Sequence, residues 1–326
     1  MPTITLVESV NMALDHELQR DPDVVLLGED IGKSGGVFRA TDGLYGKYGE
    51  RRVLDTPLAE SLIVGLSVGM ASQAMRPVAE IQFMGFIFPA FNQIATAVAR
   101  MRNRTRGRIT LPMVIRMPYG GGIHAPEHHS ESTEALLAHL PGLKVVIPSD
   151  PARAYGLLLA AIRDPDPVIF LEPKRVYRVM KQDVEDNGEA YPLECCFVER
   201  EGSDITLVSW GAMMHETRQA AALMEAEGIS CEVIDLVTIA PLDIRTIVES
   251  VEKTGRCVII QEAPRSGGIA SEIAAELAEK AILSLLAPIG RVTGYDTVMP
   301  YARTEHRYMP DVERIVDEIR KTMEFQ

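Results

Sequence analysis

The sequence predicts an α/β protein with two doubly wound, mainly parallel sheets. Short apolar runs of strand length alternate with stretches of helical period, which is the pattern of a parallel sheet covered on both faces. The alternation weakens between residues 172 and 200, where charges and turn residues gather, and then resumes. With 326 residues, 46% of them hydrophobic, the chain is long enough for two domains. We predict a first domain over 1–185, a linker over 186–200 and a second domain over 201–326.

Each predicted domain contains several helices and strands. In the first, helices are expected at 5–20, 56–74 and 151–163, strands at 24–27, 77–83, 112–117, 145–147 and 168–171, and an apolar-faced segment at 85–101. In the second, strands are expected at 204–209, 231–235, 257–262 and 289–293, and helices at 214–227, 243–253, 269–285 and 312–323. Ligands are expected at the carboxyl ends of the strands. In the second domain His215 and His306 are interpreted as surface or packing residues.

The segment from 55 to 91 contains the most unusual helix. Thr56 and Pro57 resemble a capping hydroxyl followed by a proline at the first helical position. The helix that follows is apolar on nearly every face, and Gly65 and Gly69, four residues apart, leave a groove where another element can pack. We therefore expect this helix to be buried.

Glu60 stands in the first turns of that apolar helix. A capping box would need the acid three residues after the hydroxyl, and Glu60 is four after Thr56. A favourable interaction with the helix dipole is one explanation. The other is functional, because removal from water raises the pKa of a carboxyl and lets it share a proton with a partner. Glu60 is the first candidate catalytic residue.

Two motif-like stretches do not meet the requirements of their motifs. Residues 28–34, GEDIGKS, have three residues between the glycines where a phosphate-binding loop needs four, and two of the three are acidic. Residues 124–128 read H-x-x-E-H, but Pro126 inside the motif prevents the helix that a zinc site would need. His128 and His129, on a glycine-rich loop after a strand, are then equally compatible with a structural or a substrate-facing role.

Composition and charge exclude several classes of function. The net charge of −13 argues against nucleic acid or an anionic membrane as a partner. No apolar run is long enough to span a bilayer, and the first residues lack the features of a signal or transit peptide, so we expect a cytoplasmic protein. The four cysteines lack paired spacing and are expected to be free thiols. The arginines between 100 and 108 favour a solvated or subunit-facing loop over a phosphate site.

Several separated motifs together resemble a known family. The stretches DTPLAES, RPVAEIQF, HHSES, PGLKVVIPSDP, IRDPDPVIFLEPKRVYR, EVIDLVTIAPLD, KTGR and APIGRVTGYDT occur in this order along nearly the whole chain. They resemble the β subunit of the thiamine-diphosphate-dependent decarboxylating component of 2-oxo acid dehydrogenase complexes. The resemblance implies a transketolase-like fold, with a pyrimidine-binding domain followed by a transketolase C-terminal domain. It also implies an α2β2 heterotetramer in which the α subunit carries most of the diphosphate and Mg²⁺ site.

The resemblance assigns roles to individual residues. It implies that Glu60 hydrogen-bonds a pyrimidine nitrogen of thiamine diphosphate and favours the imino tautomer, which deprotonates the thiazolium carbon. It places the backbone of Leu58 and the ring of Phe86 against the same pyrimidine, with Gln82 and Phe88 lining the pocket. It implies that His129 serves the transfer of the acyl group to a lipoyl arm of the transacylase core. His128 receives no role from the resemblance.

The turn at 164–167, DPDP, has two interpretations. From its pattern alone a plain tight turn is favoured over a cation site. The resemblance changes that order, because it implies a structural potassium ion held by carbonyls of Met113, Ala161 and Ile162 with groups of Asp164 and Asp166.

Within the family the substrate is the open question. The stretches HAPEHHSES and IRDPDPVIFLEPKR are similar to pyruvate-type subunits, whereas AEIQFMGFIFPAF and GYDT are similar to branched-chain members, and we favour pyruvate. An acetoin dehydrogenase β subunit is less favoured. A self-contained transketolase is disfavoured because the chain lacks a G-D-G run with a downstream Asn, and Glu60 and His129 argue against a non-catalytic docking subunit. In bacterial members the C-terminal domain docks the transacylase, but the final MEFQ does not match that ending.

Overall fold

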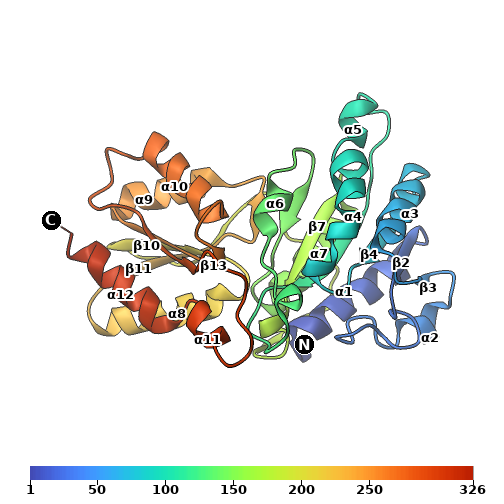
Figure 1. Ribbon diagram of the computed structural model, residues 1–326, viewed down its shortest axis with the longest axis horizontal. Coiled ribbons are helices and arrows are strands. Elements are labelled where there is room, and N and C mark those ends of the chain that lie inside the picture. The colour runs from blue at the N-terminus through green and yellow to red at the C-terminus, as the bar shows by residue number, and fades with distance from the viewer. Residues whose placement is uncertain (326) are drawn as a thin grey trace. The chain divides into compact units, whose positions relative to one another are not determined.

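The computed structural model describes residues 1–325 and divides into two compact units (Figure 1). Unit 1 contains Met1–Tyr119 and Leu136–Leu193, and unit 2 contains Gly120–Ala135 together with the chain from Glu194 onward. An excursion of the chain between the two parts of unit 1 therefore belongs to unit 2. The last residue of the MEFQ ending lies outside the described residues.

Unit 1 is built on a parallel sheet. Its neighbouring strands follow the order β3-β2-β4-β5-β7-β6, and every pair in that order is parallel. The strands are β2 (Val24–Gly28), β3 (Val53–Asp55), β4 (Arg76–Glu80), β5 (Val114–Tyr119), β6 (Lys144–Val146) and β7 (Val168–Pro173). Most of their residues are buried, as expected of a parallel sheet covered by helices on both faces.

The helices of unit 1 pack in pairs. Helix α1 (Leu6–Arg20) lies against α7 (Pro151–Arg163), and α3 (Glu60–Ser72) lies against α4 (Phe88–Gln93) and β4 (Figure 1). Thr5 and Glu8 form a capping box at the start of α1, and Asp150 caps α7 just before the proline that begins it. The remaining helical segments are α2 (Leu44–Tyr48), η1 (Met84–Phe86), the π-helix η2 (Ile94–Val98), α5 (Met101–Arg104), α6 (Glu134–Ala138), which continues from unit 2, and η4 (Lys174–Val176).

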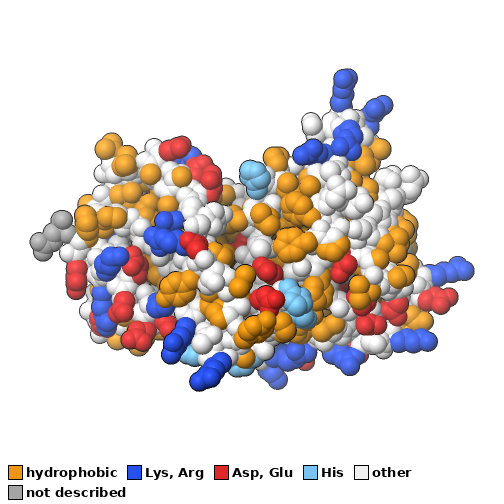
Figure 2. All heavy atoms as spheres, viewed as in Figure 1, with side chains coloured by type: hydrophobic (Ala, Val, Ile, Leu, Met, Phe, Trp, Pro, Cys, Tyr) orange, Lys and Arg blue, Asp and Glu red, His pale blue; other side chains and the backbone are white. Residues whose placement is uncertain are grey.

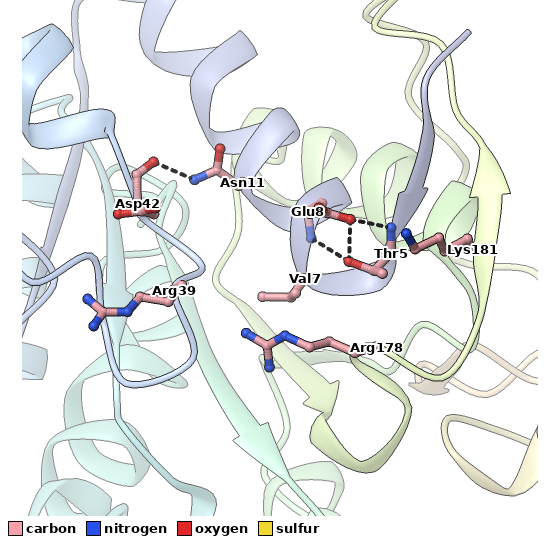
Figure 3. A pocket seen from close by; sticks show the side chains of 8 residues that line it. All are labelled: Thr5, Val7, Glu8, Asn11, Arg39, Asp42, Arg178 and Lys181. Carbon is pink, nitrogen blue, oxygen red and sulfur yellow. Dashed lines mark hydrogen bonds between the residues drawn. The ribbon is translucent and has the colours of Figure 1, made fainter.

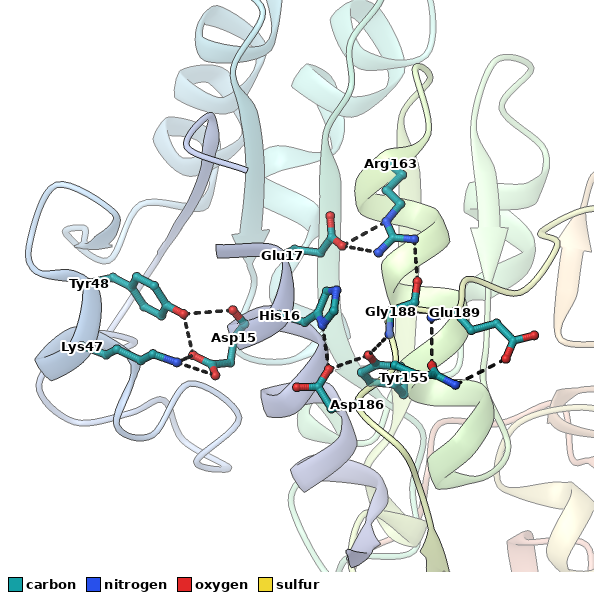
Figure 4. A network of polar contacts seen from close by, with 11 residues as sticks. Asp15, His16, Glu17, Lys47, Tyr48, Tyr155, Arg163, Asp186, Gly188 and Glu189 are labelled. Carbon is teal, nitrogen blue, oxygen red and sulfur yellow. Dashed lines mark hydrogen bonds and ion pairs between the residues drawn. The ribbon is translucent and has the colours of Figure 1, made fainter. Parts of the chain in front are cut away.

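Polar contacts tie the start of the predicted linker to these helices (Figure 4). The fully buried Glu17 of α1 accepts two hydrogen bonds from the guanidinium of Arg163, at 2.7 and 3.0 Å, and Arg163 also donates to the carbonyl of Gly188. The hydroxyl of Tyr155 donates to Asp186 at 2.7 Å and accepts from the Gly188 N–H at 2.9 Å. The charged residues around 186–189 are therefore an ordered part of unit 1.

A buried ion cluster joins three adjacent strands. Arg116 of β5 donates to both oxygens of Glu172 of β7, at 2.6 and 2.8 Å, and to Glu80 of β4. The hydroxyl of Tyr177 also donates to Glu172. Burial opposes the charge of Arg116, but the two carboxylates outweigh burial and raise its pKa, while burial raises the pKa of Glu80. The cluster ties β4 and β7 to the central strand β5.

Unit 2 repeats the layered arrangement. Its sheet has the order β14-β13-β10-β11-β9, with β9 antiparallel and the other pairs parallel. In Figure 1, α8 and α12 lie on one face and α9 and α10 on the other. The elements are β9 (Phe197–Arg200), β10 (Ile205–Ser209), α8 (Met213–Ala226), β11 (Cys231–Asp235), β12 (Thr238–Ala240), α9 (Ile244–Thr254), β13 (Cys257–Pro264), α10 (Ile269–Lys280), β14 (Gly290–Gly294), α11 (Glu305–Tyr308) and α12 (Val312–Met323).

Several predicted bounds agree with the structure, and others do not. The helices at 151–163 and 312–323 and the strand at 231–235 are confirmed. Helix α3 begins at Glu60 with Ala59 as its cap, so the predicted start at Thr56 and Pro57 is wrong. The stretch from 172 to 200 was expected to lack regular structure, but it contains β8 (Lys181–Asp183), which pairs antiparallel with β1 (Thr3–Thr5), and β9.

Two expectations from composition can be compared with the structure. No helix in the described chain has the length and apolar character needed to cross a membrane. Cys195, Cys196, Cys231 and Cys257 are free thiols, and burial raises the pKa of each.

The ion cluster predicts a large stability cost for losing its cation. In Arg116→Met, Glu80 and Glu172 would be left buried without a counter-charge, so we expect the free energy of unfolding to fall by about 3–5 kcal/mol. Urea unfolding of the full chain measures this. The matched variant Arg51→Met, at an exposed arginine, should leave the midpoint unchanged. Equal midpoints for the two variants would contradict the assigned role of Arg116.

Candidate functional site

The segment before Glu60 is fixed against the loop that follows β2. The N–H of Thr56 donates to the carbonyl of Gly28 at 2.9 Å, and the N–H of Gly32 donates to Asp55 at 2.6 Å. A Cβ atom at Gly32 would lie 2.4 Å from a carboxylate oxygen of Asp55, so only glycine allows this approach. The start of α3 is thereby held at the carboxyl ends of β2 and β3, the edge of the sheet where ligands were expected.

Glu60 is the first residue of α3 and is half-buried. Within residues 1–325 its carboxylate has no hydrogen bond or ion pair. Burial raises the pKa of the neighbouring Glu29, and the charges of Asp30 and Glu60 raise it further. Two acids thus lie near each other at the N-terminal end of a helix, where a ligand able to share a proton would relieve their repulsion.

Helix α3 is buried on one face only, which corrects the expectation of a helix buried all round. Ile63, Val64, Ser67 and Ala71 are buried. On the other face Leu62 is 48% exposed and Leu66 41%, and Leu58 before the helix is 72% exposed. A Cβ added at Gly65 or Gly69 would meet nothing within 4 Å. The groove predicted from the two glycines is therefore open in the single chain.

Phe86 belongs to an aromatic row that leads back to the ion cluster. Its ring lies 5.3 Å from that of Phe83, Phe83 lies 5.5 Å from Phe38, and Phe38 lies 5.2 Å from Tyr177, whose hydroxyl bonds Glu172. Gln82 is half-buried, two residues after the end of β4, and Phe88 at the start of α4 is 51% exposed. Gln82 and Phe86 thus follow β4, one of the strands that the ion cluster joins.

His129 lies in unit 2, on the excursion 120–135, whereas Glu60 lies in unit 1. The short helix η3 (Glu127–His129) carries both histidines of the predicted site. His129 is half-buried and His128 exposed, and their ring centroids are 4.4 Å apart. The path of the 120–135 loop therefore determines the positions of both histidines.

Glu134 is a buried acid that the sequence did not single out. Its side chain is 1% exposed, and it accepts a hydrogen bond from the indole of Trp210 at 3.4 Å. Burial raises the pKa of Glu134 to about 8, and the nearby Glu262 contributes to the increase. An acid at the start of a short apolar run is common, so no sequence signal distinguished it.

Several oxygen atoms of the predicted cation turn already accept hydrogen bonds from other residues of unit 1. The carbonyls of Ile162 and Asp164 both accept from one nitrogen of Arg76, at 2.9 and 3.4 Å, and the Met113 carbonyl accepts from a backbone N–H at 3.0 Å. The carboxylate of Asp164 accepts from Lys144 at 2.7 Å, and that of Asp166 pairs with Arg102 at 2.6 Å. A carbonyl has a second lone pair, so these contacts leave it able to bind an ion.

The arginines between 100 and 108 are exposed, and Figure 2 shows basic side chains gathered on the tip that carries α5. Arg104 and Arg108 donate to carbonyls of Thr96 and Thr105 in their own segment. The run is therefore a solvated surface of the single chain, in line with the preferred interpretation.

A separate cavity of about 510 Å³ lies at the N-terminus of α1 (Figure 3). It is lined by Thr5, Val7, Glu8, Asn11, Arg39, Asp42, Arg178 and Lys181. Glu8 is occupied by the capping box with Thr5, and Asn11 donates to the carbonyl of Asp42 at 3.1 Å. None of the predicted site residues lines this cavity, and its internal contacts belong to the start of α1.

Two family models and a solved structure show the class of protein to which the chain belongs. A family model described as "Transketolase, pyrimidine binding domain" matches residues 2–180, and one described as "Transketolase, C-terminal domain" matches residues 196–315. A solved structure described as a split gene transketolase, an inactive beta4 tetramer, is similar with a TM-score of 0.81 at 25% identity, covering 99% of each chain. The fold is that of the transketolase-type proteins, as predicted.

Curated relatives narrow the class. The chain is 53% identical to a pyruvate dehydrogenase E1 component subunit beta of Acholeplasma laidlawii over 98% of both chains. It is 49% identical to the corresponding subunit of Staphylococcus epidermidis and 48% identical to that of Staphylococcus aureus, over the full length of each. The chain belongs to the family of pyruvate dehydrogenase E1 component β subunits, which confirms the family predicted from the motifs.

Glu134 predicts a pH dependence of stability. The folded chain keeps a proton on Glu134 up to about pH 8, whereas the unfolded chain releases it near the ordinary value of 4.5. Stability should therefore fall as pH rises between these values, by at most about 1.4 kcal/mol per pH unit, and then level off. In Glu134→Gln this loss should disappear, giving a flatter profile and a higher urea midpoint at pH 8. The control is Glu313→Gln, at an exposed acid. An unchanged slope in Glu134→Gln would contradict the assignment.

Proposed function

We propose that this chain is the β half of a thiamine-diphosphate-dependent enzyme that decarboxylates pyruvate and passes the acetyl group to a lipoyl arm. The observation that carries the proposal is Glu60, a half-buried carboxylate at the sheet edge with no hydrogen-bond or ion-pair partner in the described chain. Family membership supplies the reaction class. Glu60 would be the carboxylate that this chain contributes to that reaction.

The residues of unit 1 fit a pyrimidine ring. Glu60 can share a proton between its carboxylate and a ring nitrogen, and a second acid, Glu29, lies near it. Phe86 offers a half-buried aromatic side chain, and the exposed Leu58 and the half-buried Gln82 complete the set. When bound, thiamine diphosphate supplies a carbon nucleophile and an electron sink for decarboxylation. We assign its diphosphate and Mg²⁺ mainly to the α subunit.

Exposed apolar side chains on α3, just before it and at the start of α4 support an α partner in an α2β2 heterotetramer. Leu58, Leu62, Leu66 and Phe88 are each at least 41% exposed, and the face at Gly65 is open. Large apolar side chains grouped on one face are the composition of an interface rather than of a free surface. Binding there would withdraw the start of α3, and with it Glu60, from water.

In unit 2 we assign His129 to acyl transfer toward the lipoyl-bearing transacylase core. Its ring is half-buried on a loop, and an imidazole can donate or accept a proton near neutral pH. The substrate we propose is pyruvate, because the relatives at 48–53% identity are named for it. A branched-chain 2-oxo acid is the alternative.

Activity of the assembled enzyme tests the role of Glu60. The chain is co-expressed with its α partner, and thiamine-dependent oxidation is measured with pyruvate and with 3-methyl-2-oxobutanoate. Wild type should prefer pyruvate, and Glu60→Gln should lose turnover by at least about 100-fold while the assembly stays intact, because the amide cannot take up the proton. The control Glu50→Gln, at an exposed acid, should retain activity. Normal turnover in Glu60→Gln would refute the mechanism, and a preference for the branched acid would refute the substrate.

We also propose a structural potassium ion held by the carbonyls of Met113, Ala161 and Ile162 with Asp164 and Asp166. What supports it is that the Ile162 and Asp164 carbonyls converge on one cationic nitrogen, that of Arg76. Hard oxygen donors of this kind suit a monovalent cation.

Thermal unfolding in KCl and in NaCl of equal ionic strength tests the cation. We expect a higher midpoint in KCl for wild type, and no difference between the salts for Asp166→Ala, which removes one ligand. The control Asp23→Ala, at an exposed acid outside the turn, should keep the potassium effect. Equal wild-type midpoints in the two salts would show that no selective site exists.

A further inference from the structure

The loop that carries His129 is closed on itself and held by the rest of unit 2. The N–H of Gly120 donates to the carbonyl of Glu131 at 2.8 Å, which joins the two ends of the excursion. Within it, the N–H of His129 donates to the Pro126 carbonyl at 3.0 Å, and the N–H of Ser130 to that of Glu127 at 2.8 Å. Apart from η3 and the start of α6, this loop lacks helices and strands, so other contacts must define its path.

The first contact is Glu262, near the carboxyl end of β13. Its side chain is 3% exposed, and one oxygen, Oε1, accepts from both the N–H of Gly121 and the hydroxyl of Ser132, the latter at 2.7 Å. Gly120 has a φ of +88°, and a Cβ there would lie 2.7 Å from the same oxygen. The carboxyl group therefore fits tightly against the start of the loop and also reaches the residue where the loop returns.

The second contact is Glu305, the first residue of α11. Its side chain is 2% exposed, and its two oxygens bind different residues of the loop. Oε1 accepts from the N–H of Gly122 at 2.8 Å, and Oε2 accepts from the N–H of His124 at 3.0 Å. Each glutamate thus places a buried carboxylate against main-chain N–H groups of the 120–135 loop.

We propose that Glu262 and Glu305 are positioning residues that clamp the 120–135 loop and so place His129 for acyl transfer. The inference rests on the proposed function for the role of His129. Removing a carboxylate from water is costly unless hydrogen bonds satisfy it, and here most of the bonds shown go to loop amides. The loop conformation and the two buried acids therefore stabilise each other.

The two glutamates should respond differently to substitution by glutamine, because their hydrogen bonds use their carboxylate oxygens differently. Both bonds of Glu262 go to one oxygen, so Glu262→Gln can keep them through its amide oxygen. The bonds of Glu305 use both oxygens, so Glu305→Gln must lose one and face a loop N–H with its amide NH₂. Glu262→Gln should therefore behave like wild type, and Glu305→Gln should lie between wild type and Glu305→Ala.

The test uses the enzyme co-expressed with its α partner and has two readouts. Hydrogen exchange of the 120–135 amides reports whether the loop is held. The kcat for reductive acetylation of a lipoyl domain, compared with pyruvate decarboxylation measured with an artificial electron acceptor, reports whether His129 is placed. For Glu305→Ala and Glu262→Ala we expect loop exchange at least about tenfold faster, acetylation at least about tenfold slower, and decarboxylation changed less than about threefold. Glu313→Gln, at an exposed acid, is the matched control.

Several results would overturn the clamp. Unchanged loop exchange in Glu305→Ala and Glu262→Ala would refute it directly, and so would faster exchange with unaffected acetylation. Equal loss of both reactions would indicate general damage and would also refute a positioning role. If the alanine variants fail to fold, Glu305→Gln decides, since behaviour identical to that of Glu262→Gln would contradict the assigned bonds. Acetylation that survives His129→Ala would refute the proposed role of His129, and the exchange data would still decide whether the clamp exists.

Discussion

The contact on which unit 1 depends is the buried ion cluster around Arg116. A cation in the middle of a parallel sheet is tolerable only because Glu80 and Glu172, on the strands to either side, supply charge and hydrogen bonds. That arrangement ties β4 and β7 to β5 between them. Tyr177 extends it into the aromatic row that ends at Phe86. Gln82 and Phe86, which are expected to receive a pyrimidine ring, therefore follow a strand that is held from both sides, and precise placement of a ligand requires such support.

Glu60 differs from these residues. Its position is fixed, but its carboxylate has no hydrogen-bond or ion-pair partner within residues 1–325. Its helix starts beside a loop in which a side chain at Gly32 would displace the Asp55 carboxylate, yet the Glu60 carboxylate and the apolar side chains of Leu62 and Leu66 have little to contact in the described chain. A folded surface with an unpaired acid beside exposed leucines suits binding, because a partner and a ligand would satisfy the two together. The sheet fixes the position of Glu60, and binding of a partner chain would determine how far its carboxylate is exposed to water.

Sequence reasoning worked where structure is local and failed where distant residues decide it. Helix α7 was predicted to the residue because Asp150 caps it and its apolar face is periodic. The start of α3 was missed because Thr56, which has the chemistry of a cap, donates its N–H to Gly28 in an extended segment instead. Strand β8 was missed because its exposed, charged residues carry no apolar alternation. The membership of 120–135 in unit 2 depends on contacts with Glu262 and Glu305, which lie more than a hundred residues away.

The second unit shows why a search for catalytic constellations passes over some structurally important positions. Glu134, Glu262 and Glu305 are all at least 97% buried, and none stands in a recognisable motif. Their partners include loop N–H groups and an indole, and such partners leave no trace in residue types or spacing. A buried acid that bonds main-chain amides shapes a loop whatever side chains the loop carries. The buried acids of unit 2 can in this way determine the path of the 120–135 loop, which carries His129.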